Sequence, residues 1–269
     1  MINKIRNYFN NFCLKRVANN PQLLNNLFLS KRDLVLSELY TYPSFINSGY
    51  LHFEKLFEIA KSYDLTSKNG LILDVGGADG VTAIKFHDEF KNSMIYVFEP
   101  IEDNIKVLRK NILPFDRIKL FPIALGSEKK QSHINITKRI TSSSLLNINT
   151  TDFKDDYMSS QLVPETIETI NVDVIDNLVL PNQHVSIIKL DVQGYELEVL
   201  KGAVNTLKNT DLVMVELQNH SMYSNAPMYY DIDIFLRDNG FVLLQNIPSL
   251  REKHKQLEWD AIYINKGLM

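Results

Sequence analysis

The stretch LDVGGADG, residues 73–80, places three glycines and an alanine directly after an apolar run. Glycine has no Cβ, so the backbone of this turn can adopt positive φ angles and approach a ligand closely. A helical pattern follows, and the first turn of a helix presents unpaired N–H groups. The stretch therefore predicts a strand, a ligand-binding turn and a helix at the carboxyl edge of a parallel sheet.

Strand and helix patterns alternate from this turn along the rest of the chain. They predict a doubly wound, mostly parallel α/β sheet of the Rossmann-like type, with helices on both faces. Residues 241–247 and 259–265 are joined by a segment too short for a crossover helix, which predicts an antiparallel pair at the sheet edge. Residues 132–137 alternate like a strand, and 149–165 indicate a loop. The predicted parallel strands are 71–75, 94–98, 118–122, 186–190 and 211–217, and the predicted helices between and after them are 80–91, 101–112, 193–208 and 229–239.

Helical patterns precede the first strand, at residues 2–17, 21–40 and 50–63. They predict an N-terminal helical extension over residues 1–69, followed by the α/β domain over 70–269. We expect the extension to form a lid, a substrate-selecting cap or the contact of a homodimer. A surface anchor on a membrane is the alternative for the first, amphipathic helix.

Composition excludes several classes of protein. The net charge is −3, from 29 basic and 32 acidic residues, so no broad positive field is present to attract a nucleic acid. No run reaches the roughly 18 apolar residues of a membrane helix. The single cysteine, Cys13, excludes an internal disulfide framework and suits a reducing compartment. We therefore expect a cytoplasmic protein that neither spans a membrane nor binds nucleic acid.

Acidic residues follow the first two predicted strands and indicate the kind of ligand. From Gly76 the spacing is Gly-x-Ala-x-Gly, which departs from the Gly-x-Gly-x-x-Gly of dinucleotide folds. Asp74 would repel a pyrophosphate but suits a positively charged ligand such as S-adenosylmethionine, which carries a sulfonium, an ammonium and no phosphate. Glu99 ends the next strand, where an acid accepts hydrogen bonds from both hydroxyls of a ribose.

A segment further along, IIKLDVQGYELEVLKGA, has the most specific pattern in the chain. Together with five other stretches of the chain, it resembles the FkbM family of S-adenosylmethionine-dependent methyltransferases over about residues 70–265. The resemblance implies a class I methyltransferase fold, S-adenosylmethionine as cofactor, and O-methylation of glycan sugars or secondary metabolites. The stretches are LDVGGADG (73–80), VFEP (97–100), PIALGS (122–127), SSSLL (142–146), IIKLDVQGYELEVLKGA (187–203) and VELQNH (215–220).

The resemblance assigns residues to the cofactor, and it has two departures. The turn Gly76, Gly77, Ala78 and Gly80 would hold the methionine portion, and Ala124 would lie at the cofactor as well. The family usually has Gly-Ala-Asn where this chain has Gly76-Gly77-Ala78, so an asparagine contact is missing. The family commonly has Glu where this chain has Gln193, so a charge is absent from the acceptor side.

Methyl transfer to a hydroxyl requires alignment of donor and acceptor and a group that accepts the proton. Asp191, Glu216 and Lys189 lie at or near the carboxyl ends of neighbouring predicted strands, where we expect them to meet Asp74. Lys189 should be paired with Asp74 or Glu216, either as an ion-paired strut or as a catalytic lysine. His220 follows its strand on the same side and is the candidate general base among the histidines. The main prediction includes no metal; the alternative is a divalent cation held by Asp191, Glu216 and Asn219.

Three classes of function remain distinct on this evidence. The first is an O-methyltransferase acting on a sugar or glycan hydroxyl, with a lipid or polyketide-like metabolite as the alternative acceptor. The second is an NAD-dependent oxidoreductase, which the glycine spacing disfavours. The third is a non-catalytic binding protein of the same fold.

Overall fold

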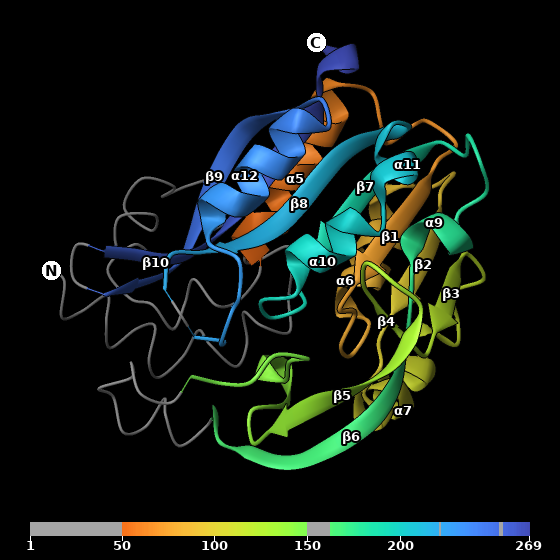
Figure 1. The fold of residues 1–269 in the computed structure, drawn as a ribbon. Helices are drawn as coiled ribbons and strands as arrows, with labels where there is room; N and C mark the ends of the chain where they lie inside the picture. Colours follow the sequence, from red (N-terminus) through yellow and green to blue (C-terminus); the bar gives the residue numbers. More distant parts are fainter. Residues whose placement is uncertain (1–49, 150–161, 221, 253–254) are drawn as a thin grey trace, which may run out of the picture. The chain divides into compact units, whose positions relative to one another are not determined.

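The computed structural model describes residues 50–149, 162–220, 222–252 and 255–269, and a seven-stranded sheet lies at its centre (Figure 1). The strands are β1 (Leu71–Val75), β2 (Met94–Phe98), β3 (Ile118–Phe121), β7 (Val185–Leu190), β8 (Thr210–Gln218), β9 (Phe241–Glu252) and β10 (Lys255–Asn265). Their order is β3-β2-β1-β7-β8-β10-β9. β10 runs antiparallel to β8 and β9, and the other neighbouring pairs are parallel. The predicted sheet, with its antiparallel pair at the edge, is confirmed.

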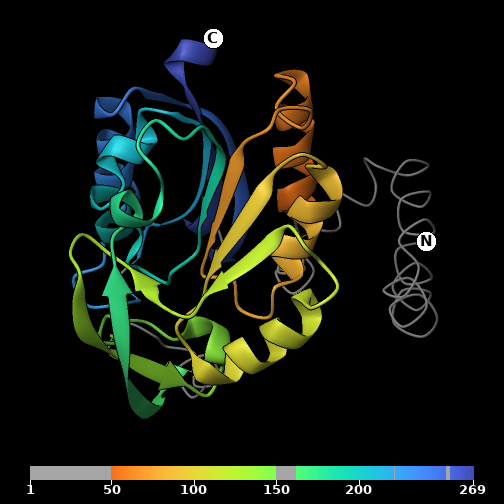
Figure 2. The ribbon, with the colours of Figure 1, turned by 90° about the vertical axis from the view of Figure 1, so that its right-hand side faces the viewer.

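Helices cover both faces of this sheet (Figure 2). One face carries α5 (Tyr50–Ser62), α6 (Val81–Glu89) and α7 (Glu102–Ile112). The other carries α9 (Ile175–Leu178), α10 (Glu196–Lys201), α11 (Val204–Leu207) and α12 (Tyr229–Asp238), and the short 3₁₀ helix η3 (Lys266–Leu268) follows β10. None of the helices in the described part of the chain is long and apolar enough to cross a membrane.

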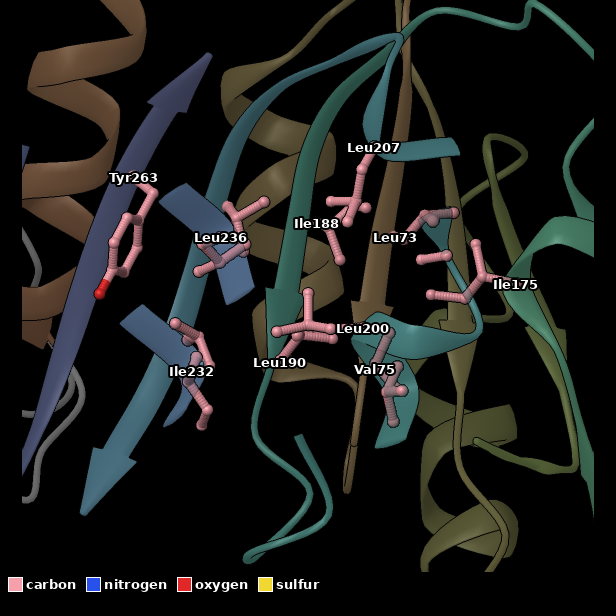
Figure 3. Close-up of a cluster of buried hydrophobic side chains, with 14 of the residues drawn as sticks. Leu73, Val75, Ile175, Ile188, Leu190, Leu200, Leu207, Ile232, Leu236 and Tyr263 are labelled. Carbon is pink, nitrogen blue, oxygen red and sulfur yellow. The ribbon is translucent and has the colours of Figure 1, made fainter. Parts of the chain in front are cut away.

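Each central strand is apolar on both faces because both faces are covered by helices. In β1, Leu73 and Val75 lie on the face that carries α9, α10 and α11, as Figure 3 shows, whereas Ile72 lies in the cluster with α5 and α6. Side chains alternate along a strand, so Asp74 points to the α5 face, and by the same alternation Lys189 joins it there. The carboxyl end of the α5 face is therefore polar, while the opposite face stays apolar.

Helix α5 is an integral part of this structure. Leu56 and Ala60 are fully buried, and Phe53 packs edge-on against Phe86 of α6 with ring centroids 5.8 Å apart. α5 belongs to the same compact unit as the sheet, and this unit spans Gly49–Met269. The predicted helices at 2–17 and 21–40 lie outside the described residues.

A second sheet was only partly predicted. It contains β4 (Ala124–Leu125), β5 (Lys130–Thr137) and β6 (Pro164–Asp173) in the order β4-β6-β5, and the 3₁₀ helix η2 (Ile140–Ser142) follows β5. β5 agrees with the strand expected at 132–137. β6 was missed because most of its side chains are exposed and its start falls in the segment interpreted as a loop. The five β-branched residues among 166–172 were the signal available for it.

The single helix predicted over 193–208 is wrong, because the structure has α10 and α11 there. They are separated at Gly202, where a Cβ would lie only 2.1 Å from the carbonyl oxygen of Gly126. This close approach of two backbones requires glycine and interrupts the helix.

Candidate functional site

The turn between β1 and α6 is held by the ends of the two neighbouring strands. The N–H groups of Gly76 and Gly77 donate to the carbonyl oxygen of Phe98 at 3.0 and 3.1 Å. Gly76 has φ +78°, and a Cβ on it would lie 1.9 Å from the carbonyl oxygen of Asp191. Glycine is therefore required here, and the turn lies directly against Asp191.

Glu99 follows β2 and supports the same turn from the other side. Its Oε2 accepts the N–H of Ala78 and its Oε1 accepts the N–H of Ile101, both at 2.9 Å. Ala78 has φ +44°, which is unfavourable for a residue with a Cβ, and the hydrogen bond to Glu99 offsets that cost. Burial raises the pKa of Glu99, while hydrogen bonds from Ile101, Asn104 and Ala78 oppose the rise. A carboxylate has about four acceptor positions, so after these three donors one position remains for a ligand hydroxyl.

Lys189 of β7 is an ion-paired centre beneath this turn. Its Nζ donates to the carbonyl oxygen of Gly76 at 3.0 Å and lies 3.4 Å from Asp74 Oδ1 and 3.7 Å from Asp191 Oδ2. Burial alone would lower the pKa of Lys189, but Asp74, Asp191 and Asp260 outweigh it and raise the pKa. The ammonium therefore stays charged. This geometry supports the strut over a lysine that accepts a proton, and the predicted pairing with Asp74 is confirmed.

Asp191 and Glu216 are brought together by a residue between them. Gln193 Nε2 donates to Asp191 Oδ1 at 2.8 Å and to Glu216 Oε2 at 3.0 Å. Burial, followed by the charges of Asp191, Glu258, Asp260 and Glu196, raises the pKa of Glu216 well above its usual range. The expected meeting of Asp74, Lys189, Asp191 and Glu216 is confirmed, and Gln193 links the last two by hydrogen bonds that the sequence did not predict.

The two histidines near this edge of the sheet are each paired with an acid of β10. His220, the candidate base, has its Nε2 3.0 Å from Glu258 Oε1. His52 of α5 contacts Asp260 through its Nδ1, is buried, and was not predicted as a site residue. Asp260 is the register partner of Glu216, so α5 reaches the acidic end of the sheet. The available signal was a histidine in a helix whose buried face is otherwise apolar.

One pocket joins several of these groups. The space between its lining residues is about 710 Å³, which includes a part open to solvent. Of the predicted residues, Gly76, Ala78, Glu99, Ala124 and Asp191 line it. The other predicted residues do not line it, namely Asp74, Gly77, Gly80, Lys189, Glu216 and His220. Lining residues that the sequence did not predict include Asn104, Gln193, Tyr195 and, from β5 and the segment after it, Ile134, Ile140, Thr141 and Leu145.

The chemistry of this lining fits S-adenosylmethionine. Two carboxylates, Glu99 and Asp191, face the pocket, and among the described residues that line it there is no Lys, Arg or His. Such a wall attracts a sulfonium and an ammonium and repels a pyrophosphate. Glu99 follows β2 at the position suited to ribose hydroxyls, and apolar residues including Phe98 and Ile101 can cover an adenine ring.

A metal site receives no support from the described part of the chain. It contains no group of three or more His, Cys, Asp or Glu side chains arranged to hold a metal ion.

Two methyltransferases are similar in sequence to parts of this chain. Hexuronic acid methyltransferase AglP of Haloferax volcanii is 35% identical over 86 residues, which are 29% of this chain and 35% of AglP. The chain thus matches about a third of that relative. 2-O-methyltransferase NoeI of Sinorhizobium fredii is 24% identical over 191 residues, 68% of this chain and 77% of NoeI. A solved structure, the magnesium protoporphyrin IX methyltransferase ChlM of Synechocystis PCC 6803, overlaps 98% of this chain and 96% of its own with a TM-score of 0.45 and 9% identity.

The family of the chain follows from a match over most of its length. The methyltransferase FkbM domain matches residues 74–243, which include the glycine turn, Glu99, Asp191 and Glu216. This match excludes the oxidoreductase interpretation and, with the phosphate-repelling pocket, makes S-adenosylmethionine the cofactor. The chain belongs to the FkbM family of methyltransferases.

Proposed function

We propose that this protein transfers a methyl group from S-adenosylmethionine to a hydroxyl of a sugar or glycan. The observation that carries the proposal is the shared pocket: Asp191, the candidate proton acceptor, lines the same pocket as the cofactor residues Gly76, Ala78 and Glu99. Donor and acceptor groups can therefore meet at the carboxyl ends of β1 and β7. This is the arrangement that an in-line transfer requires.

Each residue has a distinct part in the proposed reaction. S-adenosylmethionine supplies an activated methyl group when it is bound. The turn from Gly76 to Ala78 and the carboxylate of Glu99 bind and orient it. Asp191 orients the acceptor hydroxyl and accepts its proton, while charged Lys189 fixes Asp191 against the turn. Glu216 and His220 are the second candidates for the proton.

The proposed class of acceptor is supported by the names of two relatives and by the acidic side chains at the carboxyl edge of the sheet. Two relatives are named for hexuronic acid and 2-O methylation, and both names describe transfer to sugars or hydroxyls. Carboxylates such as Asp191 and Glu216 can accept hydrogen bonds from a hydroxyl. A lipid or polyketide-like alcohol is the alternative acceptor. We place the reaction in the cytoplasm, and we propose that the N-terminal extension predicted over residues 1–69 contributes a lid, a substrate-selecting cap or a homodimer contact.

Calorimetry and a turnover assay test the proposal together. Titration with S-adenosylmethionine should show binding, whereas NAD should not bind. Release of S-adenosylhomocysteine should then occur with acceptors from a panel of neutral sugars, hexuronates and long-chain alcohols, and mass spectrometry should locate the added methyl group on a sugar.

Other results would contradict the proposal in defined ways. Turnover with the long-chain alcohols alone would replace the acceptor class. Cofactor binding without turnover on any acceptor would support a non-catalytic binding protein. Binding of NAD in preference to S-adenosylmethionine would reject the assignment of the pocket.

A further inference from the structure

The loop between β7 and α10 has an unusual backbone that determines where one side chain points. Gln193 has φ +55° and is followed by Gly194 with φ +94°. A residue with a Cβ seldom adopts this conformation unless its surroundings stabilise it. Glu196 does so here, because its Oε1 accepts the N–H groups of Val192 at 3.0 Å and Gly194 at 3.2 Å. The loop is thus fixed with the Gln193 side chain between Asp191 and Glu216.

Both ends of the Gln193 amide are used. Its Nε2 donates to Asp191 and Glu216, and its Oε1 accepts from the hydroxyl of Tyr223 at 2.8 Å. Tyr223 is buried, and burial followed by the charge of Glu216 raises its pKa well above the usual range, so the hydroxyl keeps its proton. The acids Asp191 and Glu216 accept hydrogen bonds, so the amide nitrogen faces them and the amide oxygen faces the Tyr223 hydroxyl.

The same residue joins three parts of the fold. The main-chain oxygen of Gln193 accepts from Ser144 Oγ at 2.7 Å, and the Tyr223 hydroxyl also lies 3.0 Å from the carbonyl oxygen of Ser142. Asp191 and Glu216 belong to the ends of β7 and β8, whereas Ser142 and Ser144 lie at and just after η2. Gln193 is consequently surrounded by fixed partners.

An amide suits this place better than a carboxylate. A glutamine side chain offers two N–H donors and one acceptor, which is the set that its partners require. A glutamate of the same shape would place a third carboxylate between two others, where like charges disfavour ionisation. Gln193 therefore satisfies both acids and Tyr223 without adding a charge.

We infer that Gln193 is a positioning residue, which holds the carboxylates of Asp191 and Glu216 side by side toward the acceptor and fixes them to Tyr223. The inference rests on the proposed function, because it concerns the groups that receive the acceptor hydroxyl. It goes beyond that function because it states that one neutral amide, that of Gln193, positions both acids.

Substitution Gln193→Glu tests the inference without changing shape. The matched control is Gln183→Glu, which adds the same charge near the amino end of β7, where the Gln183 Oε1 accepts the N–H of Leu180. At about pH 8, the charge introduced by Gln193→Glu should separate the acids and lower kcat by roughly 10- to 100-fold, the scale of misplaced reacting groups. Gln183→Glu should retain the wild-type kcat, and both variants should bind S-adenosylmethionine within a few-fold of wild type.

The pH dependence distinguishes positioning from simple structural damage. The carboxyl group introduced by Gln193→Glu should have a pKa above its unfolded value, since burial and two carboxylates disfavour its charge. It is then neutral at low pH and donates one hydrogen bond, but loses this proton as the pH rises. The ratio of kcat in Gln193→Glu to kcat in wild type should therefore fall between about pH 5.5 and about pH 8. For Gln183→Glu the ratio should stay constant.

A measurement independent of activity separates this inference from the proposed function. The melting temperature of Gln193→Glu should approach that of wild type at low pH and decline relative to it as the pH rises. The inference would be overturned if Gln193→Glu showed the same pH dependence of kcat ratio and melting temperature as Gln183→Glu. It would also be overturned if Gln193→Glu were already unfolded at about pH 5.5. If wild type methylates no acceptor, the proposed function fails while the melting temperatures still test Gln193.

Discussion

Asp191 is the exposed member of the acidic pair around Lys189. Its side chain is 42% exposed, whereas that of Asp74 is 0% exposed, so only Asp191 can reach a bound acceptor directly. Both acids are held by the same ammonium, and both lie at the carboxyl ends of neighbouring strands. The exposed Asp191 can therefore contact the acceptor, whereas the buried Asp74 supports the turn.

Asp191→Asn should impair the chemical step more than cofactor binding. The substitution retains the shape and removes the charge that accepts the hydroxyl proton, so kcat should fall by on the order of 10²-fold or more. Affinity for S-adenosylmethionine, measured by calorimetry, should remain within a few-fold of wild type. Asp238→Asn, at an exposed position in α12, is the control. Normal turnover by Asp191→Asn, or loss of activity through lost cofactor binding alone, would favour Glu216 or His220 as the base.

Glu99 is the residue whose loss should weaken cofactor binding directly. Its carboxylate faces the pocket and is only 3% exposed. Glu99→Ala should reduce the binding free energy of S-adenosylmethionine by about 1.5 to 3 kcal/mol, the scale of hydrogen bonds to a charged group. Calorimetry measures the binding free energy, and circular dichroism checks that the variant is folded. The control is Glu102→Ala in the exposed first turn of α7. Unchanged affinity in a folded Glu99→Ala protein would reject the ribose contact.

At the scale of elements, the loop between β7 and α10 is held by the carboxylate of a buried glutamate. Glu196 begins α10, is 2% exposed, and closes the preceding loop by accepting two backbone N–H groups. Burial, and to a smaller extent the charge of Asp191, raises its pKa to about 7, against the opposing effect of the hydrogen bonds. The loop that holds Asp191 and Gln193 is therefore stabilised by a group that titrates near neutral pH.

This raised pKa predicts a pH-dependent stability. A folded pKa above the unfolded one means that the folded state binds more protons, so stability is lost as the pH rises from about 4.5 to about 7. Glu196→Gln retains an acceptor oxygen and removes the titration. The unfolding free energy of the variant should therefore rise relative to wild type over that interval, by up to about 3 kcal/mol. Urea unfolding at several pH values measures the difference, and two parallel curves would contradict the assignment.

At the scale of the whole molecule, α5 connects the start of the described chain to the acidic edge of the sheet. Its apolar residues pack on the sheet, and His52 contacts Asp260 beside the register position of Glu216. The part of the chain before the first strand therefore contributes both to the core and to the surroundings of the site.

Deletion of residues 1–69 should accordingly damage the fold. It removes Phe53, Leu56, Ala60 and Leu65, all buried, and uncovers their apolar partners on the sheet and α6. We expect the shortened protein to aggregate or to change its oligomeric state, which light scattering after gel filtration measures. A full-length Leu56→Ala variant should lose about 2 to 5 kcal/mol of stability if α5 packs as described. A soluble, fully active truncation of unchanged oligomeric state would contradict the prediction.

The local sequence by itself determined the strands of the central sheet and the ligand turn. β1 and β2 have the predicted bounds, because each is a short apolar run bounded by polar residues or glycine. The turn at Gly76 and the strand-end acids Asp74, Glu99 and Asp191 follow from position alone, since parallel strands end at the same edge. The sequence also indicated that Lys189 needed a charged partner, because a central strand excludes an unpaired charge.

Only the tertiary structure decided which of these groups touch. The contacts of Gln193 with Glu216 and Tyr223, and of His52 with Asp260, join residues far apart in the chain. No local pattern encodes such pairs, since each depends on strand order, on register and on a left-handed backbone at Gln193. The second sheet and the break at Gly202 were likewise settled by packing, because exposed strands and close backbone approaches have weak local signals. Short-range periodicity specifies elements, whereas the site is specified by distances that exist only after the elements have packed together.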